Sequence, residues 1–118
     1  MQLEGLWSIS FNEAVCKEGV GVGVWMQLPD GKVLSYSYKF AYECTNNEAE
    51  YEALMLAIQI LKNFQVNKVL IRGDSELVIK QLQGEYQARH PRMCSYRNAI
   101  QDLVKGFDLC EFSLIPRL

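Results

Sequence analysis

Thr45-Asn46-Asn47-Glu48-Ala49-Glu50-Tyr51-Glu52-Ala53-Leu54 is the stretch on which the fold prediction depends. Asn47 is a favourable N-cap residue, because its side-chain oxygen can accept a hydrogen bond from a backbone N–H of the first helical turn. Glu50 follows three residues later, at the spacing of a capping box. It also begins a stripe at helical spacing that is otherwise apolar, formed by Glu50, Leu54, Ala57 and Leu61. A carboxylate on the core-facing side of a helix is either part of a cap or part of a site, and both interpretations stay open.

The residues before this stretch predict three antiparallel strands. Residues 6–11 and 32–40 alternate between the two faces of a strand, and residues 19–28 interleave glycine with valine before Trp25. Pro29-Asp30-Gly31 is a turn signal between the second and third strands. We expect the first strand to end at Phe11, so that Asn12 follows the strand in a loop.

The residues after it predict further helices and strands in alternation. The short apolar run 67–72 is typical of a buried parallel strand. Ser75 is a favourable N-cap and Pro91 a favourable first helical residue. The expected elements are helix 48–64, strand 67–72, helix 76–82, a helix from Pro91 to about Phe107 and strand 110–115. The pattern predicts an α/β fold with a five-stranded mixed sheet, an antiparallel meander joined to parallel strands by helical crossovers.

Length and composition predict one domain over residues 1–118. The formal net charge is −2, which argues against strong non-specific nucleic-acid binding. The charge is uneven, because residues 1–61 carry −5 and residues 62–105 carry +4. Four scattered cysteines and one histidine make a zinc site unfavourable and indicate a reducing, intracellular compartment, cytoplasmic or nuclear. No apolar stretch is long enough to cross a bilayer.

Three polar side chains are the candidates for chemistry. Asn12 and Asp74 follow neighbouring strands of the expected sheet, and Glu50 lies at the start of the helix between them. If they converge, their oxygens would suit Mg²⁺ or Mn²⁺. Each also has a structural explanation, since Asp74 could cap its helix, Glu50 could complete the capping box and Asn12 could form a turn.

The chain resembles the ribonuclease H family, especially its reverse-transcriptase-like branch from plants and retroelements (retrotransposons). The resemblance covers essentially the whole chain, and four stretches carry it in family order and at family spacing. They are Thr45-Asn46-Asn47-Glu48-Ala49-Glu50-Tyr51, Arg72-Gly73-Asp74-Ser75, Gln81-Leu82-Gln83-Gly84-Glu85-Tyr86 and Leu114-Ile115-Pro116-Arg117. The first two together are specific to the family.

The resemblance implies a hydrolase, a magnesium- or manganese-dependent endonuclease that cuts the RNA strand of an RNA–DNA hybrid. It implies that Glu50 contacts metal and helps to order the attacking water, and that Asp74 is a metal ligand. It also implies that polar groups of Thr45, Asn46, Asn47 and Ser75 hold the nucleic acid.

Two departures from the family pattern lead us to expect weak or absent cleavage. Asn12 stands where the family has an aspartate that bridges both metals, and an amide oxygen is a weaker ligand for a hard cation. The family's last metal aspartate lies on a helix beyond the final strand, and the sequence stops at Leu118. The alternative is a non-catalytic scaffold or protein-interaction domain derived from a retroelement. Without the last helix, one sheet face should expose apolar surface and favour a homodimer.

Overall fold

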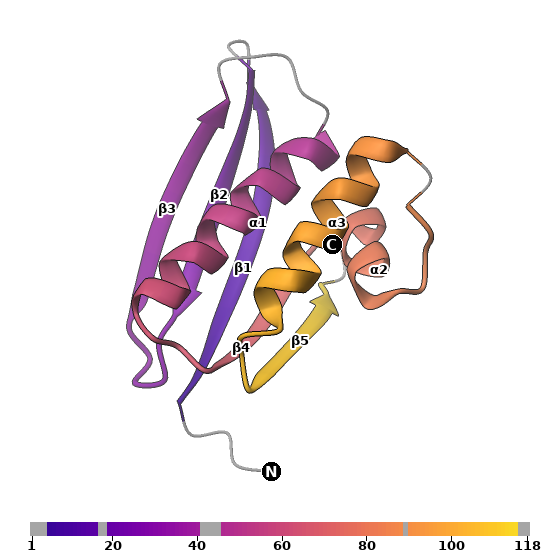
Figure 1. Cartoon of the computed structure of the whole chain (residues 1–118). Coiled ribbons are helices and arrows are strands. Elements are labelled where there is room, and N and C mark those ends of the chain that lie inside the picture. The colour runs from indigo at the N-terminus through magenta and orange to yellow at the C-terminus, as the bar shows by residue number, and fades with distance from the viewer. Residues whose placement is uncertain (1–4, 17–18, 41–45, 89, 116–118) are drawn as a thin grey trace.

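The computed structural model describes residues 5–16, 19–40, 46–88 and 90–115 (Figure 1). Along these residues the elements are β1 (Leu6–Cys16), β2 (Gly19–Gln27), β3 (Val33–Phe40), α1 (Asn46–Asn63), β4 (Lys68–Gly73), α2 (Glu76–Gln83), α3 (Pro91–Val104) and β5 (Leu109–Leu114). Their order confirms the alternation predicted from the sequence.

The strands form one mixed sheet with the spatial order β3-β2-β1-β4-β5. β1 is the central strand and pairs antiparallel with β2 and parallel with β4. β2 and β3 complete the antiparallel meander, and β5 adds a second parallel pair at the edge. The predicted α/β fold with a five-stranded mixed sheet is therefore confirmed.

The first strand is longer than the sequence pattern predicts. It continues through Asn12 to Cys16, because the pairing of β1 with β2 runs on to the Cys16–Gly19 pair. The expectation that Asn12 follows the strand in a loop is wrong. Only the pairing with β4 stops early, at the Phe11–Gly73 pair.

Two helix ends also differ from their predicted positions. α1 begins at Asn46, so Asn47 lies inside its first turn and the predicted N-cap at Asn47 is wrong. α3 ends at Val104 rather than near Phe107, because the chain leaves it through two tight turns in which Gly106 and Phe107 donate to carbonyl oxygens three residues back. Other helix signals are confirmed: Ser75 caps α2, and Pro91 begins α3.

The core lies between the sheet and the helices, on one face of the sheet. Alternate residues of β1, β2 and β4 are buried there, including Ile9, Phe11 and Val24. The predicted stripe of α1 faces the same core, and its members are at most 1% exposed: Glu50, Leu54, Ala57 and Leu61. The helix period was therefore interpreted correctly, including the buried position of Glu50.

The opposite face of the sheet is mostly polar in the described part of the chain. The register aligns small hydroxyl side chains and charges across it, with several apolar residues among them. Its polar residues include Ser8, Ser10, Ser35, Ser37, Arg72, Glu111 and Ser113, and its apolar residues include Leu6, Trp25, Val33, Leu70 and Leu109. Trp25 and Val33 are 45% and 57% exposed, so the expected apolar surface is present in part. The homodimer remains a prediction.

A close contact joins β1 to the end of β4. A Cβ atom at Gly73 would lie 2.5 Å from the ring of Phe11, which is 2% exposed and has no room to move. Phe11 and Gly73 are also the last pair of the β1–β4 ladder. Glycine at this position lets the aromatic ring cover the strand end.

Replacement of Gly73 by alanine should therefore destabilise the fold. We expect Gly73→Ala to lower the free energy of unfolding by about 1–3 kcal/mol, because the new methyl group overlaps the Phe11 ring. Gly106→Ala is the matched control, since the nearest atom to its Cβ would be the flexible Lys62 amine at 3.1 Å, and the Leu103 carbonyl oxygen at 3.7 Å is at an ordinary contact distance. Urea denaturation measures both variants, and equal losses of stability would contradict this account.

Candidate functional site

Asn12 and Asp74 directly follow the last residue pair of the β1–β4 ladder. That pair is Phe11 and Gly73; Asn12 continues β1, and Asp74 is the first residue after β4. The side chain of Asn12 is exposed, whereas Asp74 is half-buried and its Oδ1 atom is shielded from solvent. By strand alternation Asn12 shares the open face of the sheet with Ser10, and its proximity to Asp74 remains a prediction.

Glu50 is the fifth residue of α1 and is 1% exposed, with its Oε2 atom inside the protein. A buried carboxylate is costly unless other groups stabilise it, and this makes the position unusual for a helix. α1 packs across β1 and β2, on the core side of the sheet (Figure 1). The convergence of Glu50 with Asn12 and Asp74 remains a prediction.

The structural explanations for these three residues do not apply. Asn12 lies within a strand and forms no turn. Asp74 precedes the N-cap of α2, which is Ser75. Glu50 lies too far into α1 to complete a capping box with Asn47, because the helix already begins at Asn46. The predicted turn, N-cap and capping box are therefore not the roles of these three residues.

The oxygen atoms of these side chains fit a hard divalent cation, since Mg²⁺ and Mn²⁺ prefer carboxylate and amide oxygens. Within residues 5–16, 19–40, 46–88 and 90–115, no three histidine, cysteine, aspartate or glutamate side chains gather as a metal cluster. A metal here would have two carboxylates, Glu50 and Asp74. Strand alternation directs Asn12 to the open face of the sheet, whereas Glu50 is buried on the core side, so Asn12 as a neutral third ligand remains a prediction.

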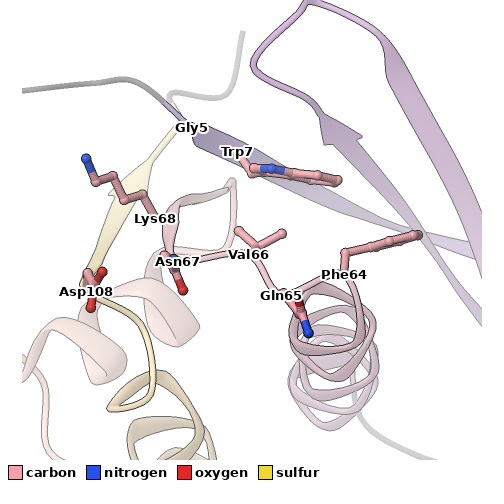
Figure 2. A pocket seen from close by; sticks show the side chains of 8 residues that line it. All are labelled: Gly5, Trp7, Phe64, Gln65, Val66, Asn67, Lys68 and Asp108. Atoms are coloured by element: carbon pink, nitrogen blue, oxygen red, sulfur yellow. The ribbon is translucent and has the colours of Figure 1, made fainter.

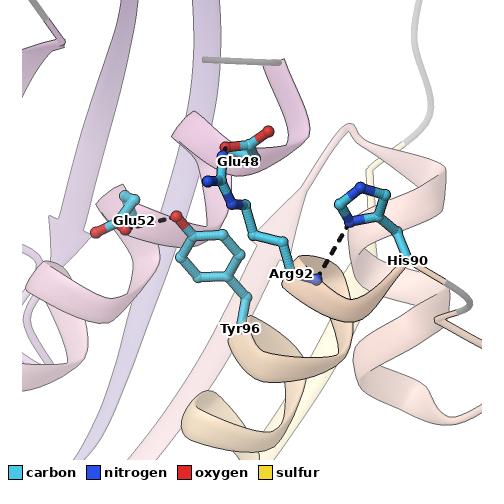
Figure 3. Close-up of polar contacts among 5 residues, drawn as sticks. All are labelled: Glu48, Glu52, His90, Arg92 and Tyr96. Carbon is cyan, nitrogen blue, oxygen red and sulfur yellow. Dashed lines mark hydrogen bonds and ion pairs between the residues drawn. The ribbon is translucent and has the colours of Figure 1, made fainter. Parts of the chain in front are cut away.

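An ion pair ties the first turn of α1 to the start of α3 (Figure 3). Arg92 Nη1 lies 2.9 Å from Glu48 Oε2, and the Glu48 side chain is only 12% exposed. His90 caps α3, because its Nδ1 atom accepts a hydrogen bond from the Arg92 N–H at 3.2 Å. This contact holds the α1 turn that precedes Glu50.

Tyrosines extend the contact between the helices along their length. Tyr96 donates a hydrogen bond of 2.7 Å to Glu52, and its ring stacks on Tyr51 with centroids 5.6 Å apart. Tyr51 in turn donates a hydrogen bond of 2.6 Å to Gln81 of α2. The residues on both sides of Glu50 are thus fixed to α2 or α3.

Sequence reasoning missed this network, although a signal for it exists. Glu48 and Glu52 are four residues apart on α1, and Arg92 and Tyr96 are four residues apart on α3. Side chains at this spacing share one helix face, so the two pairs are matched in position and in chemistry. The pairing spans 44 residues, which a local pattern does not reveal.

The residues predicted to hold nucleic acid are only partly described. Asn47 is half-buried in the first turn of α1, and Ser75 Oγ accepts a hydrogen bond of 3.4 Å from the Val78 N–H. Asn46 is the first residue of α1, and its backbone alone is described. Thr45 lies outside the described residues. Their contacts with nucleic acid remain predictions.

A separate cavity of about 270 Å³ lies at the opposite end of β1, where the strand begins (Figure 2). Trp7 and Phe64 stack on one of its sides, with ring centroids 5.8 Å apart. Its lining comes from the start of β1 and the α1–β4 connection, so it does not belong to the candidate site. In the described part of the chain, no helix is long and apolar enough to span a membrane.

Comparison with known proteins identifies the family. The model of the reverse-transcriptase-like family matches residues 12–118. A ribonuclease HI of Halobacterium salinarum is 34% identical over 88 residues, which cover 75% of this chain and 44% of that protein. The chain belongs to the ribonuclease H family. A bifunctional protein of Mycobacterium tuberculosis is 27% identical over 99 residues, 84% of this chain and 27% of its own length. The chain thus spans less than half the length of these relatives.

Solved structures agree with this ribonuclease H assignment. RNase H1 from Halobacterium salinarum superimposes with a TM-score of 0.84 at 30% identity, over 95% of this chain and 86% of that one. LC11-RNase H1 in complex with an RNA/DNA hybrid has a TM-score of 0.80 at 29% identity, over 94% and 86% of the two chains. The RNase H domain from Mycobacterium tuberculosis, at 23% identity and a TM-score of 0.83, supports the fold alone.

Loss of the Arg92 charge should destabilise the domain modestly. Arg92→Met leaves the largely buried Glu48 carboxylate without this partner, and we expect about 1 kcal/mol less stability because the Arg92 end of the pair is 64% exposed. Lys105→Met is the control, since the Lys105–Asp102 pair at 3.2 Å is at least 75% exposed at both ends. Urea denaturation at low salt measures the stability of both variants. A loss of stability in Lys105→Met as large as that in Arg92→Met would contradict the stabilising role of the Arg92–Glu48 ion pair.

Stability should also fall at alkaline pH through Tyr51. Burial raises the pKa of the Tyr51 hydroxyl well above its usual 10.0; Arg97 partly opposes the shift and Glu50 adds to it. As the pH rises, the unfolded chain loses the Tyr51 hydroxyl proton before the folded protein does. The contribution of Tyr51 to the free energy of unfolding is therefore complete below pH 10.0 and declines as the pH rises above this value. In urea titrations between about pH 9 and 11, the native protein should lose more stability than Tyr51→Phe. Parallel losses in the two proteins would rule this out.

Proposed function

We propose that this chain is a nucleic-acid-binding ribonuclease H domain that hydrolyses the RNA strand of RNA–DNA hybrids slowly in the presence of Mg²⁺ or Mn²⁺. The observation that carries the proposal is a pair of carboxylates with oxygens shielded from solvent, Glu50 near the start of α1 and Asp74 directly after β4. The match to the ribonuclease H family supports it, as does the likeness to an RNase H1 solved with a hybrid.

Each side chain has a distinct part in this proposal. Asp74 and Glu50 contribute the negative charge that holds the cation, and burial of their oxygens strengthens that attraction. The bound cation stabilises the attacking and leaving oxygens of the phosphoryl transfer. Glu50 also orients the water that attacks the phosphate, and the ion pair at Glu48 holds the α1 turn from which it projects.

Slow turnover follows from Asn12. An amide oxygen carries no formal charge, so it offsets less of the cation's charge than an aspartate would. The phosphate backbone of the bound hybrid adds further negative charge to the site. A cation held by two carboxylates instead of three occupies the site less fully. Binding of the hybrid does not depend on this residue alone, since Thr45, Asn46, Asn47 and Ser75 supply separate polar contacts.

A second candidate function is a non-catalytic nucleic-acid-binding or protein-interaction domain. The exposed amide of Asn12, which continues β1 past the last β1–β4 pair, is the observation that favours it. In that case the hybrid would bind without being cut, and replacement of Asn12 by aspartate would produce no activity.

The test is cleavage of an end-labelled RNA–DNA hybrid in Mg²⁺ and in Mn²⁺, with hybrid binding measured in parallel by fluorescence anisotropy. We expect slow cleavage of the RNA strand by the native chain and roughly tenfold or more faster cleavage by Asn12→Asp, equivalent to about 1.4 kcal/mol or more of transition-state stabilisation. Glu50→Gln and Asp74→Asn should abolish cleavage in both backgrounds and leave hybrid binding in place.

Two results would contradict the proposal. Cleavage that persists in Glu50→Gln or Asp74→Asn would exclude these carboxylates from the reaction. Hybrid binding without cleavage, in the native chain and in Asn12→Asp alike, would favour the non-catalytic function.

A further inference from the structure

A buried hydrogen bond connects the two helices nearest to the candidate carboxylates. The Tyr51 hydroxyl donates to Gln81 Oε1 at 2.6 Å, with Tyr51 fully buried and Gln81 4% exposed. A tyrosine and a glutamine placed together in an otherwise apolar core are costly to bury unless they satisfy one another. Packing alone therefore does not explain why both side chains are polar.

Tyr51 and Gln81 lie on the helices that begin next to the two carboxylates. Tyr51 directly follows Glu50 on α1. Gln81 lies in the last turn of α2, an eight-residue helix whose N-cap Ser75 directly follows Asp74. Both ends of α2 are capped, so the bond at Gln81 ties to α1 the helix whose start lies next to Asp74.

The ring of Tyr51 is itself held in place. Tyr96 of α3 stacks on it almost in parallel, at an interplanar angle of 4°. Glu52 accepts a hydrogen bond from the Tyr96 hydroxyl, and this bond fixes the Tyr96 ring to α1. The Tyr51 side chain is therefore fixed on both its ring and its hydroxyl group, directly beside Glu50 in the sequence.

We propose that Tyr51 and Gln81 are positioning residues that set the separation of Glu50 and Asp74 for a divalent cation. This inference rests on the proposed function, because it assigns the pair to the same metal site. The hydrogen bond fixes α1 and α2 relative to one another before any cation arrives. A cation then binds carboxylates that are already in position, so the free energy of binding is not reduced by the cost of ordering them.

The experiment measures Mn²⁺ affinity directly, by electron paramagnetic resonance of free Mn²⁺, without nucleic acid. The variants are Tyr51→Phe, Gln81→Leu and the double variant, with urea denaturation of each. Tyr86→Phe is the matched control, since the exposed Tyr86 hydroxyl donates a 2.8 Å hydrogen bond to Glu76, also on α2. Kinetics on the labelled hybrid in the Asn12→Asp background give kcat and KM separately.

We expect each single variant to weaken Mn²⁺ binding about three- to tenfold and the double variant to weaken it no further, because the two side chains act through one bond. kcat should fall in parallel while KM for the hybrid stays constant. The double variant should regain stability lost in Tyr51→Phe, since no buried polar partner is left unpaired, yet its Mn²⁺ affinity should remain low. Tyr86→Phe should bind Mn²⁺ as the native chain does.

Unchanged Mn²⁺ affinity in Tyr51→Phe, with reduced stability, would overturn the inference and leave the pair a structural feature. Affinity that recovers together with stability in the double variant would also overturn it. These outcomes are distinct from failure of the proposed function. If Mn²⁺ affinity responds as expected but no hybrid is cut, the positioning role stands and the ribonuclease function falls.

Discussion

The parallel pairing of β1 with β4, closed by the Phe11–Gly73 contact, is the constraint on which the candidate site depends. The pairing fixes which residues of the two strands lie beside one another. Its end at Phe11 and Gly73 leaves Asn12 and Asp74 as the next residues on each side. Because Gly73 lacks a Cβ, the Phe11 ring can cover the strand end on the core side, and β4 can turn away into α2 directly after it.

The helices add a second constraint, which acts on Glu50 from both sides. Glu48 is held by Arg92, and Glu52 and Tyr51 are held by Tyr96 and Gln81. Three helices thus meet around one turn of α1, and polar contacts at their junction are more specific in geometry than apolar packing would be. This arrangement is suited to a carboxylate that must keep a fixed position while buried, and it gives the ribonuclease H fold a rigid frame for chemistry.

The fold was predictable because its signals are local. Alternation along 32–40, the short apolar run at 67–72 and the stripe from Glu50 to Leu61 each reflect one element and the face it buries. Besides the shifted ends of α1 and α3, the errors concern contacts with distant residues. Nothing in the sequence near Asn12 shows that β2 continues to pair as far as Cys16, and nothing near Glu48 shows that Arg92 lies opposite. The polar composition of the open sheet face became visible only once the register aligned its serines.

The site was predictable in part. The family motifs point to Glu50, Asp74 and Asn12, and the structure shields oxygens of the first two from solvent. The convergence of the three side chains stays a prediction. The supporting side chains Tyr51, Gln81 and Arg92 have no motif of their own, because their roles depend on how the helices cross.

The proposal depends above all on Glu50 and Asp74 sharing one divalent cation. Anomalous diffraction from crystals grown with Mn²⁺ tests this most directly. We expect a single anomalous peak within coordination distance of carboxylate oxygens of both Glu50 and Asp74. A peak elsewhere on the protein, or none at these carboxylates at saturating Mn²⁺, would contradict it.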